Sequence, residues 1–195
     1  MDPGSPAVDE SVEVATAADM RHLGERLAGL LRAGDLVVLS GSLGAGKTTL
    51  TQGIGAGLGV RGPVTSPTFV IARQHPSLRG GPDLVHADAY RLGSRAEVDD
   101  LDLDTDVATS VTVVEWGEGL VEDLAPSFLQ VAISAAAAGL AEGDPGSGQG
   151  DPGSGEGDPG SGERDELRTV RVLGWGERWR DVAPAARQAV AGRVT

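Results

Sequence analysis

The chain has 195 residues and a formal net charge of −13. That length suggests one domain, and the acidic balance argues against autonomous binding to a nucleic-acid backbone. The absence of cysteine excludes disulfides, iron–sulfur clusters and cysteine-based zinc sites.

The N-terminal segment MDPGSPAVDE is acidic and has neither the basic nor the apolar region of a signal peptide. No apolar run approaches the roughly 20 residues that span a bilayer. We therefore expect no membrane association and a cytoplasmic location. Residues 1–10 are expected to form a disordered tail, and residues 11–195 a single domain.

The first half of the domain predicts two strand–helix pairs. SVEVAT (11–16) alternates like an edge strand. The segment after it carries leucines at helical spacing, with Thr16 and Asp19 as an N-terminal cap and Gly34 as the expected stop. LVVLS (36–40) is a continuous apolar run that predicts a buried parallel strand, and a helix should follow from Lys47 to about Leu58.

The second half predicts strands at 69–73, 84–88 and 111–115, with short helices at 94–101 and 117–124. Two alternating segments, 128–134 and 168–175, predict a late antiparallel pair, and a closing helix should be interrupted near Pro184. The alternation of strands and helices indicates an α/β fold with a mainly parallel sheet. It does not determine the order of the strands.

Residues 143–163 are three consecutive heptads, GDPGSGQ, GDPGSGE and GDPGSGE. Glycine, proline, serine and acidic residues cannot build a core, and nothing apolar occupies the a or d position of a coiled coil. We therefore expect the domain to be interrupted by a disordered loop at about 140–166. A flexible spacer is the preferred interpretation, and a binding motif is the alternative.

A glycine-rich loop follows the first buried strand and matches G-x-x-x-x-G-K-[ST] at every required position. Its backbone N–H groups and the start of the following helix can surround phosphates, Lys47 can reach the β- and γ-phosphates, and the Thr48 hydroxyl can bind Mg²⁺. The predicted nucleotide-binding residues of this segment are Gly41, Ser42, Leu43, Gly44, Ala45, Gly46, Lys47, Thr48 and Thr49.

Lys47 is the only lysine in the chain, whereas there are 15 arginines. A compact ammonium on a slim stem fits the loop in a way that the planar guanidinium does not. A single lysine also excludes the [NT]-K-x-D motif by which GTPases read guanine, and the separate β3 lysine of protein kinases. ATP is therefore the expected nucleotide, by elimination.

A site of this kind needs an acidic side chain near Mg²⁺, normally at the end of a neighbouring strand. Asp88 ends LVHAD and Glu115 ends VTVVE, so both should lie at the carboxyl edge of the sheet. One could contact the metal while the other orients water, and the sequence does not divide these roles. The predicted catalytic residues are Asp88, Glu115 and Lys47.

Three further features of the sequence bear on the site and the core. TSPTF (65–69) can bring the hydroxyls of Ser66 and Thr68 to the γ-phosphate as a switch-like loop. We interpret His86 as lying on the opposite strand face from Asp88, and therefore as structural. The three tryptophans, Trp116, Trp175 and Trp179, are interpreted as packing residues, since no basic cluster accompanies them.

Four motifs in order, GSLGAGKTTL, TSPTF, HADAYRL and VVEWGEG, resemble those of the bacterial TsaE (YjeE-type) family. The resemblance runs from about residue 11 to 134 and more loosely to the C-terminus. One departure is Ser42, where the family usually has Asp.

The resemblance implies a P-loop NTPase fold and an ATPase of tRNA threonylcarbamoyladenosine biosynthesis with low intrinsic activity. It implies two partner proteins, of TsaB and TsaD type, that transfer the threonylcarbamoyl group onto adenosine 37 of tRNAs reading ANN codons, with tRNA contacting this chain only indirectly. By motif, Lys47 would bind phosphate, Thr48 and Glu115 would hold Mg²⁺, and Asp88 would take part in hydrolysis.

Two other functions are compatible with the glycine loop. A small-molecule kinase would carry an arginine-bearing lid, for which Arg91 and Arg95 are available. A nucleotide-gated binding protein would use the bound state alone as its signal.

Overall fold

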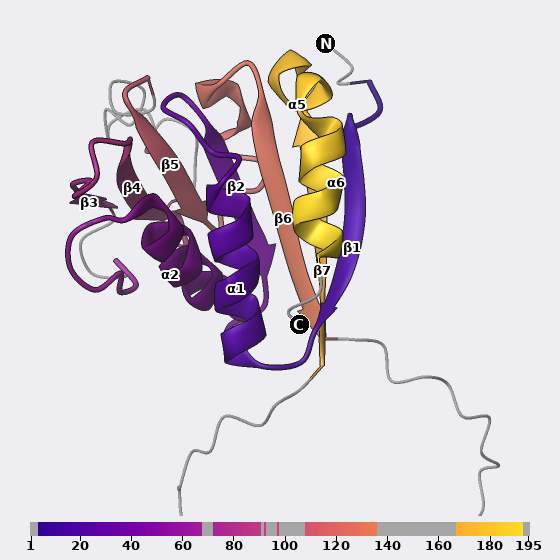
Figure 1. Ribbon diagram of the computed structural model, residues 1–195, viewed down its shortest axis with the longest axis horizontal. Coiled ribbons are helices and arrows are strands. Elements are labelled where there is room, and N and C mark those ends of the chain that lie inside the picture. Colours follow the sequence, from indigo (N-terminus) through magenta and orange to yellow (C-terminus); the bar gives the residue numbers. More distant parts are fainter. Residues whose placement is uncertain are drawn as a thin grey trace, which may run out of the picture.

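The structure, a computed structural model, describes residues 4–67, 72–90, 92, 97, 108–135 and 167–192 (Figure 1). Its elements in chain order are β1 (Val8–Val14), α1 (Ala17–Ala28), β2 (Leu36–Gly41), α2 (Lys47–Leu58), β3 (Ala72–His75), β4 (Asp83–Asp88), β5 (Ser110–Glu115), the 3₁₀ turn η1 (Glu122–Leu124), β6 (Phe128–Ala135), β7 (Arg168–Trp175), α5 (Glu177–Asp181) and α6 (Ala183–Ala191). The expected helix at 94–101, apart from Glu97, and the heptads lie outside these ranges.

One seven-stranded sheet has the order β1-β7-β6-β2-β5-β4-β3. The four strands β6, β2, β5 and β4 run parallel at its centre. At one side β7 is antiparallel to β6 and β1 to β7, and at the other β3 is antiparallel to β4. The predicted α/β class, the parallel centre and the late antiparallel pair are confirmed.

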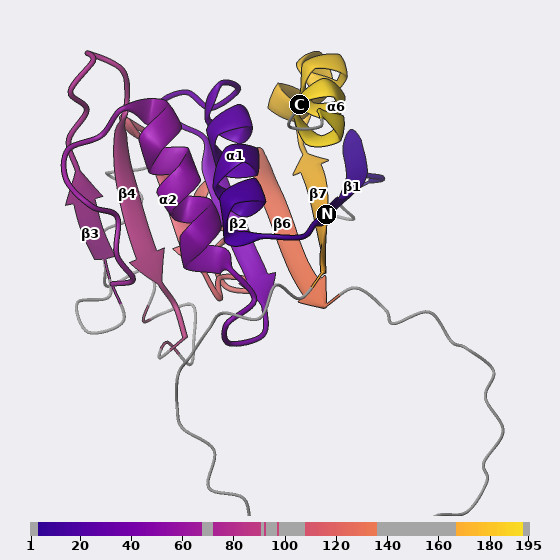
Figure 2. The same ribbon diagram turned by 60° about the horizontal axis from the view of Figure 1, so that its bottom comes forward.

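Three helices, α1, α2 and α6, cover one face of the sheet (Figures 1 and 2). Their apolar side chains form one core with Val37, Leu39 and the other residues that point to that face. The alternate residues Leu36 and Val38 point to the opposite face, where Val121 and Ala125 from the segment around η1 pack on them. The middle of β2 is therefore buried on both sides, which explains its unbroken apolar sequence.

Several predicted boundaries move. β1 begins at Val8 rather than residue 11. Residues 69–71 of the strand predicted at 69–73 lie outside the described residues, and β3 extends past residue 73 to His75. Thr16 and Asp19 form the predicted capping box of α1.

Two predicted helix assignments are wrong. Helix α1 ends at Ala28 with Gly29 as its cap, because the N–H groups of Leu30 and Leu31 bond only three residues back, to Leu27 and Ala28. Gly34, with φ +92°, lies in the turn that leads into β2. The helix predicted at 117–124 is only the short turn η1. The interruption near Pro184 is confirmed, since α5 and α6 meet at Val182.

A buried ion pair attaches the C-terminal helices to the start of β2. The Arg178 guanidinium lies 3.1 Å from the carboxylate of Asp35, which is 4% exposed. The same guanidinium donates a hydrogen bond to the Leu30 carbonyl at 2.7 Å. Removing one member of such a pair would leave an uncompensated buried charge, so these contacts stabilise the position of α5.

Helices α1 and α2 approach each other through glycines. A Cβ atom on Gly24 would overlap the Leu50 carbonyl oxygen, and a Cβ on Gly53 would overlap that of Arg21. The obstruction in both cases is backbone, which cannot rotate away. The glycines therefore set the distance between α1 and the helix that follows the glycine loop.

We predict that Gly53→Ala destabilises the protein by about 2 kcal/mol, because the added methyl group pushes α2 from α1. Without that contact the change would stabilise the helix by about 1 kcal/mol through its higher propensity. The control is Gly29→Ala, where the Cβ would lie 3.4 Å from the nearest atom and φ is −63°. Urea unfolding measures both, and a more stable Gly53→Ala protein would contradict the described helix contact.

Burial lowers the pKa of His75 below its usual value, although a hydrogen bond with the Arg61 backbone opposes the shift. The unfolded state then binds more protons between the two pKa values, so stability falls as the pH drops below about 6.5. We predict that His75→Gln reduces the loss of unfolding free energy between pH 7.5 and 5.5, measured by urea titration. His22→Gln, at an exposed histidine, is the control and should leave that loss unchanged.

Candidate nucleotide-binding site

The glycine loop connects the end of β2 to the start of α2, as predicted. Gly41 has φ +139°, and a Cβ there would overlap the Ile133 carbonyl of β6. Gly46, the N-cap of α2, has φ +108°, and its Cβ would lie 3.3 Å from the end of Met20 in α1. Only glycine allows the loop to fit between these two elements.

No side chain caps the first turn of α2. The backbone N–H groups of that turn lack partners within the helix, and together with the helix dipole they favour an anion. The loop therefore presents the backbone features of a phosphate site at the edge of the sheet where β2 ends.

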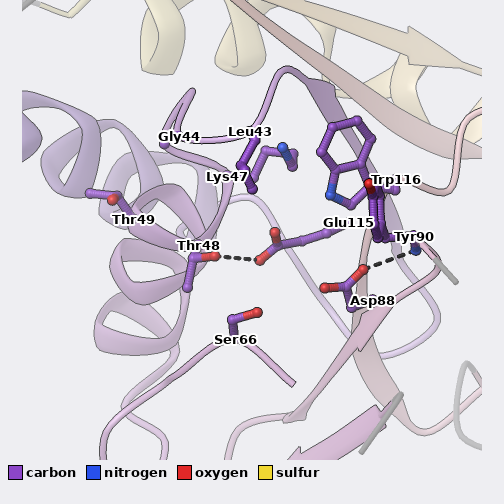
Figure 3. Close-up of a pocket in the computed structure, with 11 residues that line it drawn as sticks. Leu43, Gly44, Lys47, Thr48, Thr49, Ser66, Asp88, Tyr90, Glu115 and Trp116 are labelled. Carbon is purple, nitrogen blue, oxygen red and sulfur yellow. Dashed lines mark hydrogen bonds between the residues drawn. The ribbon is translucent and has the colours of Figure 1, made fainter. Parts of the chain in front are cut away.

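A pocket of about 410 Å³ opens beside this loop (Figure 3). The loop and helix residues lining it are Leu43, Gly44, Gly46, Lys47, Thr48 and Thr49, and the residues from other segments are Ser66, Asp88, Tyr90, Glu115 and Trp116. Gly41, Ser42 and Ala45, also predicted from the motif, do not line it. Thr68 and Arg91 lie outside the described residues.

Lys47 extends along the loop, with only 4% of its surface exposed. Its Nζ donates hydrogen bonds to the carbonyls of Gly41 and Ser42, at 2.8 and 2.9 Å. It also lies 3.8 Å from the centre of the Trp116 ring. Burial lowers the pKa of Lys47, while the carboxylates of Glu115 and Asp88 oppose that shift.

The parallel pairing of the central strands brings the acidic side chains to the loop. β2 and β5 pair so that Leu39 lies opposite Glu115, and β4 and β5 pair so that Asp88 also lies opposite Glu115. The Thr48 hydroxyl donates a hydrogen bond of 2.8 Å to Glu115 Oε1. Asp88 Oδ1 accepts one from the Tyr90 backbone at 2.9 Å (Figure 3).

The interpretation of His86 as lying on the opposite face from Asp88 is wrong. Residues i and i+2 of a strand point to the same face, so His86 and Asp88 share the face that carries the site. His86 Nε2 lies 2.8 Å from Glu115 Oε1, and the imidazole is completely buried.

Two aromatic residues complete the pocket and were not assigned to it from the sequence. Trp116, interpreted as a packing residue, contacts Lys47, and its ring lies 5.2 Å from that of Tyr90. Trp116 has φ +61°, a conformation that is uncommon outside glycine and is often found at functional sites. The sequence does indicate that Trp116 lies near the site, because Trp116 directly follows Glu115 at the end of β5. A residue that follows the end of a strand lies at the same edge of the sheet as that strand end. Trp175 and Trp179 do pack, against Phe128 and within the core respectively.

The oxygen-rich donor set fits a magnesium ion bound together with a nucleotide. Thr48 offers a hydroxyl and Glu115 a carboxylate, which are hard ligands suited to Mg²⁺. In the described part of the chain, no three His, Cys, Asp or Glu side chains gather closely enough to hold a metal by themselves.

The model of the family described as "Threonylcarbamoyl adenosine biosynthesis protein TsaE" matches residues 14–140. A Streptomyces coelicolor protein named tRNA threonylcarbamoyladenosine biosynthesis protein TsaE is 57% identical over 161 residues, which are 82% of this chain and 93% of the relative. A Bacillus subtilis protein of the same name is 37% identical over 119 residues, 60% of this chain and 73% of the relative.

The crystal structure of Bacillus subtilis YdiB is similar in fold. Its TM-score to this chain is 0.63, with 24% sequence identity, over 92% of this chain and 95% of that one. At this identity the similarity is evidence for the arrangement of the sheet and helices.

Proposed function

The chain belongs to the TsaE family, and we propose that it acts in tRNA threonylcarbamoyladenosine biosynthesis as an ATP-binding protein with weak intrinsic ATPase activity. The observation that carries the proposal is the convergence of Lys47, Thr48 and Glu115 in one pocket at the carboxyl edge of the sheet. We infer the pathway from the names of the relatives, and nucleotide binding from the residues that line the pocket. The comparisons give no support to the small-molecule kinase.

The phosphates of ATP would lie in the glycine loop. The backbone of residues 41–49 and the start of α2 supply N–H donors and a partial positive charge. Lys47 is held against the loop by two carbonyls, so its ammonium is already oriented before phosphate arrives. Ser66 lines the pocket from a separate segment, and we propose that Ser66 and Thr68 act as the switch-like element.

Thr48 and Glu115 would hold Mg²⁺, which neutralises charge on the phosphates when bound. The Thr48 hydroxyl directs its hydrogen toward Glu115, which leaves its oxygen lone pairs for a metal. Asp88 lies beside Glu115 in the pocket and, through its place in the family motif, is proposed to take part in hydrolysis.

We propose that this activity serves a two-protein threonylcarbamoyl transferase, of TsaB and TsaD type, and that tRNA contacts the assembly rather than this chain. A cytoplasmic location is proposed with it. Within the described ranges, no helix is both long and apolar enough to cross a bilayer.

We also propose that the chain forms one domain interrupted by the heptad loop. β6 and β7 are paired to their ends, where Ala135 lies opposite Arg168, so the intervening segment starts and finishes at the same point of the sheet. This point lies outside the residues that line the pocket.

Deletion of residues 143–163 is therefore expected to raise the free energy of unfolding by no more than about 1 kcal/mol, through the shorter loop. The nucleotide affinity should stay within about twofold, since the described residues that line the pocket come from other segments. Thermal unfolding and calorimetric titration with ADP measure the two properties. Loss of either would show that the heptads contribute to the domain.

Lys47→Ala should weaken ATP binding by about 100-fold, because it removes the charge that faces the phosphates.

Glu115→Gln should retain nucleotide binding in EDTA but lower Mg²⁺-dependent ATP hydrolysis by about 100-fold. The control is Glu118→Gln, at an exposed carboxylate outside the pocket. Normal hydrolysis by Glu115→Gln would refute its assignment to the metal.

Steady-state ATPase assays with and without the transferase pair test the dependence on partners, for which a stimulated rate is expected. A slowly hydrolysed ATP analogue then distinguishes two hypotheses, that the chain acts as an ATPase or that it acts as a nucleotide-gated binding protein. If the analogue supports multiple rounds of tRNA modification as well as ATP does, hydrolysis is not required.

A further inference from the structure

His86 is buried in β4 directly behind the proposed metal ligand. We infer that His86 is a positioning residue, whose Nε2–H group holds the Glu115 carboxylate in the orientation needed for Mg²⁺–nucleotide binding. This inference rests on the proposed function. His86 would affect the affinity for the metal by positioning Glu115, and would itself touch neither the metal nor the nucleotide.

Within the described residues, the two side-chain hydrogen bonds of Glu115 fall on one oxygen. Oε1 accepts from Thr48 Oγ1 and lies at hydrogen-bond distance from His86 Nε2, each at 2.8 Å. The two donors come from α2 and β4, elements that are distant in the sequence, so together they hold Oε1 in place. Neither Thr48 nor His86 donates to the other carboxylate oxygen, Oε2.

The direction of the histidine bond follows from the chemistry of its partner. An ionised carboxylate has no hydrogen to donate, so the hydrogen must be on Nε2. The surrounding sheet leaves the ring no exposed surface, and rotation would break the bond in a buried site. His86 therefore presents a fixed donor to Glu115.

The cost of burying His86 supports a specific role. Nδ1 of His86 is buried and has no hydrogen-bond partner within the described part of the chain. An apolar side chain would avoid that unsatisfied atom, and the neighbouring residue on this face, Leu84, shows that the core accepts one. The bond to Glu115 is the contact that an apolar residue could not make.

Hydrogen-bond partners behind a metal ligand typically change metal affinity by about 10- to 100-fold when they are removed. We therefore expect His86→Leu to raise the Mg²⁺ concentration that half-saturates ADP binding by about 10- to 100-fold. Its affinity for ADP in EDTA should stay within about twofold of wild type, since Glu115 is proposed to act on phosphate through the metal.

The experiment is calorimetric titration of the full chain with ADP, first in EDTA and then over a series of Mg²⁺ concentrations. His86→Leu removes the donor, and His86→Gln retains an amide donor near the Nε2 position. The control, His22→Leu, lies on the exposed surface of α1. His86→Gln should recover most of the Mg²⁺ response, and His22→Leu should match wild type.

Equal Mg²⁺ responses of His86→Leu and wild type would overturn the inference, as would equal losses in the Leu and Gln variants, which indicate packing alone. A second readout needs no nucleotide: the ¹⁵N spectrum of the histidine rings should show the proton of His86 on Nε2. A proton on Nδ1 alone would overturn the inference. If wild type binds no ADP in either condition, the proposed function fails instead.

Discussion

The parallel register between β2 and β5 is the constraint on which the site depends. It places Leu39, two residues before the glycine loop, opposite Glu115. A shift of one residue would turn Glu115 to the other face of the sheet, away from Thr48. The register is maintained by burial, because Leu36 and Val38 pack on one face and Val37 and Leu39 on the other. The apolar core thus determines where the acidic side chain lies.

The same pairing explains why the site combines residues distant in the sequence. The carboxyl ends of parallel strands meet at one edge, so the residues at and just after the ends of β2, β4 and β5 lie together there. The glycine loop comes from the first, Asp88 from the second, and Glu115 with Trp116 from the third. The strong positive φ angles of Gly41 and Gly46 then bring the loop back over these residues.

Much of this could be predicted from the sequence. The phosphate loop is a local motif, and the strand-end position of Asp88 and Glu115 follows from two apolar runs. The contact of His86 with Glu115 could not be predicted, because it depends on which strands are neighbours. Its face, however, follows from strand periodicity, because His86 and Asp88 are two residues apart in one strand. The end of α1 does not follow from the sequence for another reason: both Gly29 and Gly34 can stop a helix, and the local pattern does not distinguish them.

The sheet joins the two ends of the chain, and this has a consequence for the order of folding. Among the strands that the structure describes, β1 pairs with β7 alone, and Val8 lies opposite Gly174. During synthesis β1 must therefore wait for nearly the whole chain, and Asp35 likewise waits for Arg178. The glycine loop and its central strands are made earlier and need neither contact. Closing the sheet edge is thus the most non-local step, which on the basis of loop entropy should be slow.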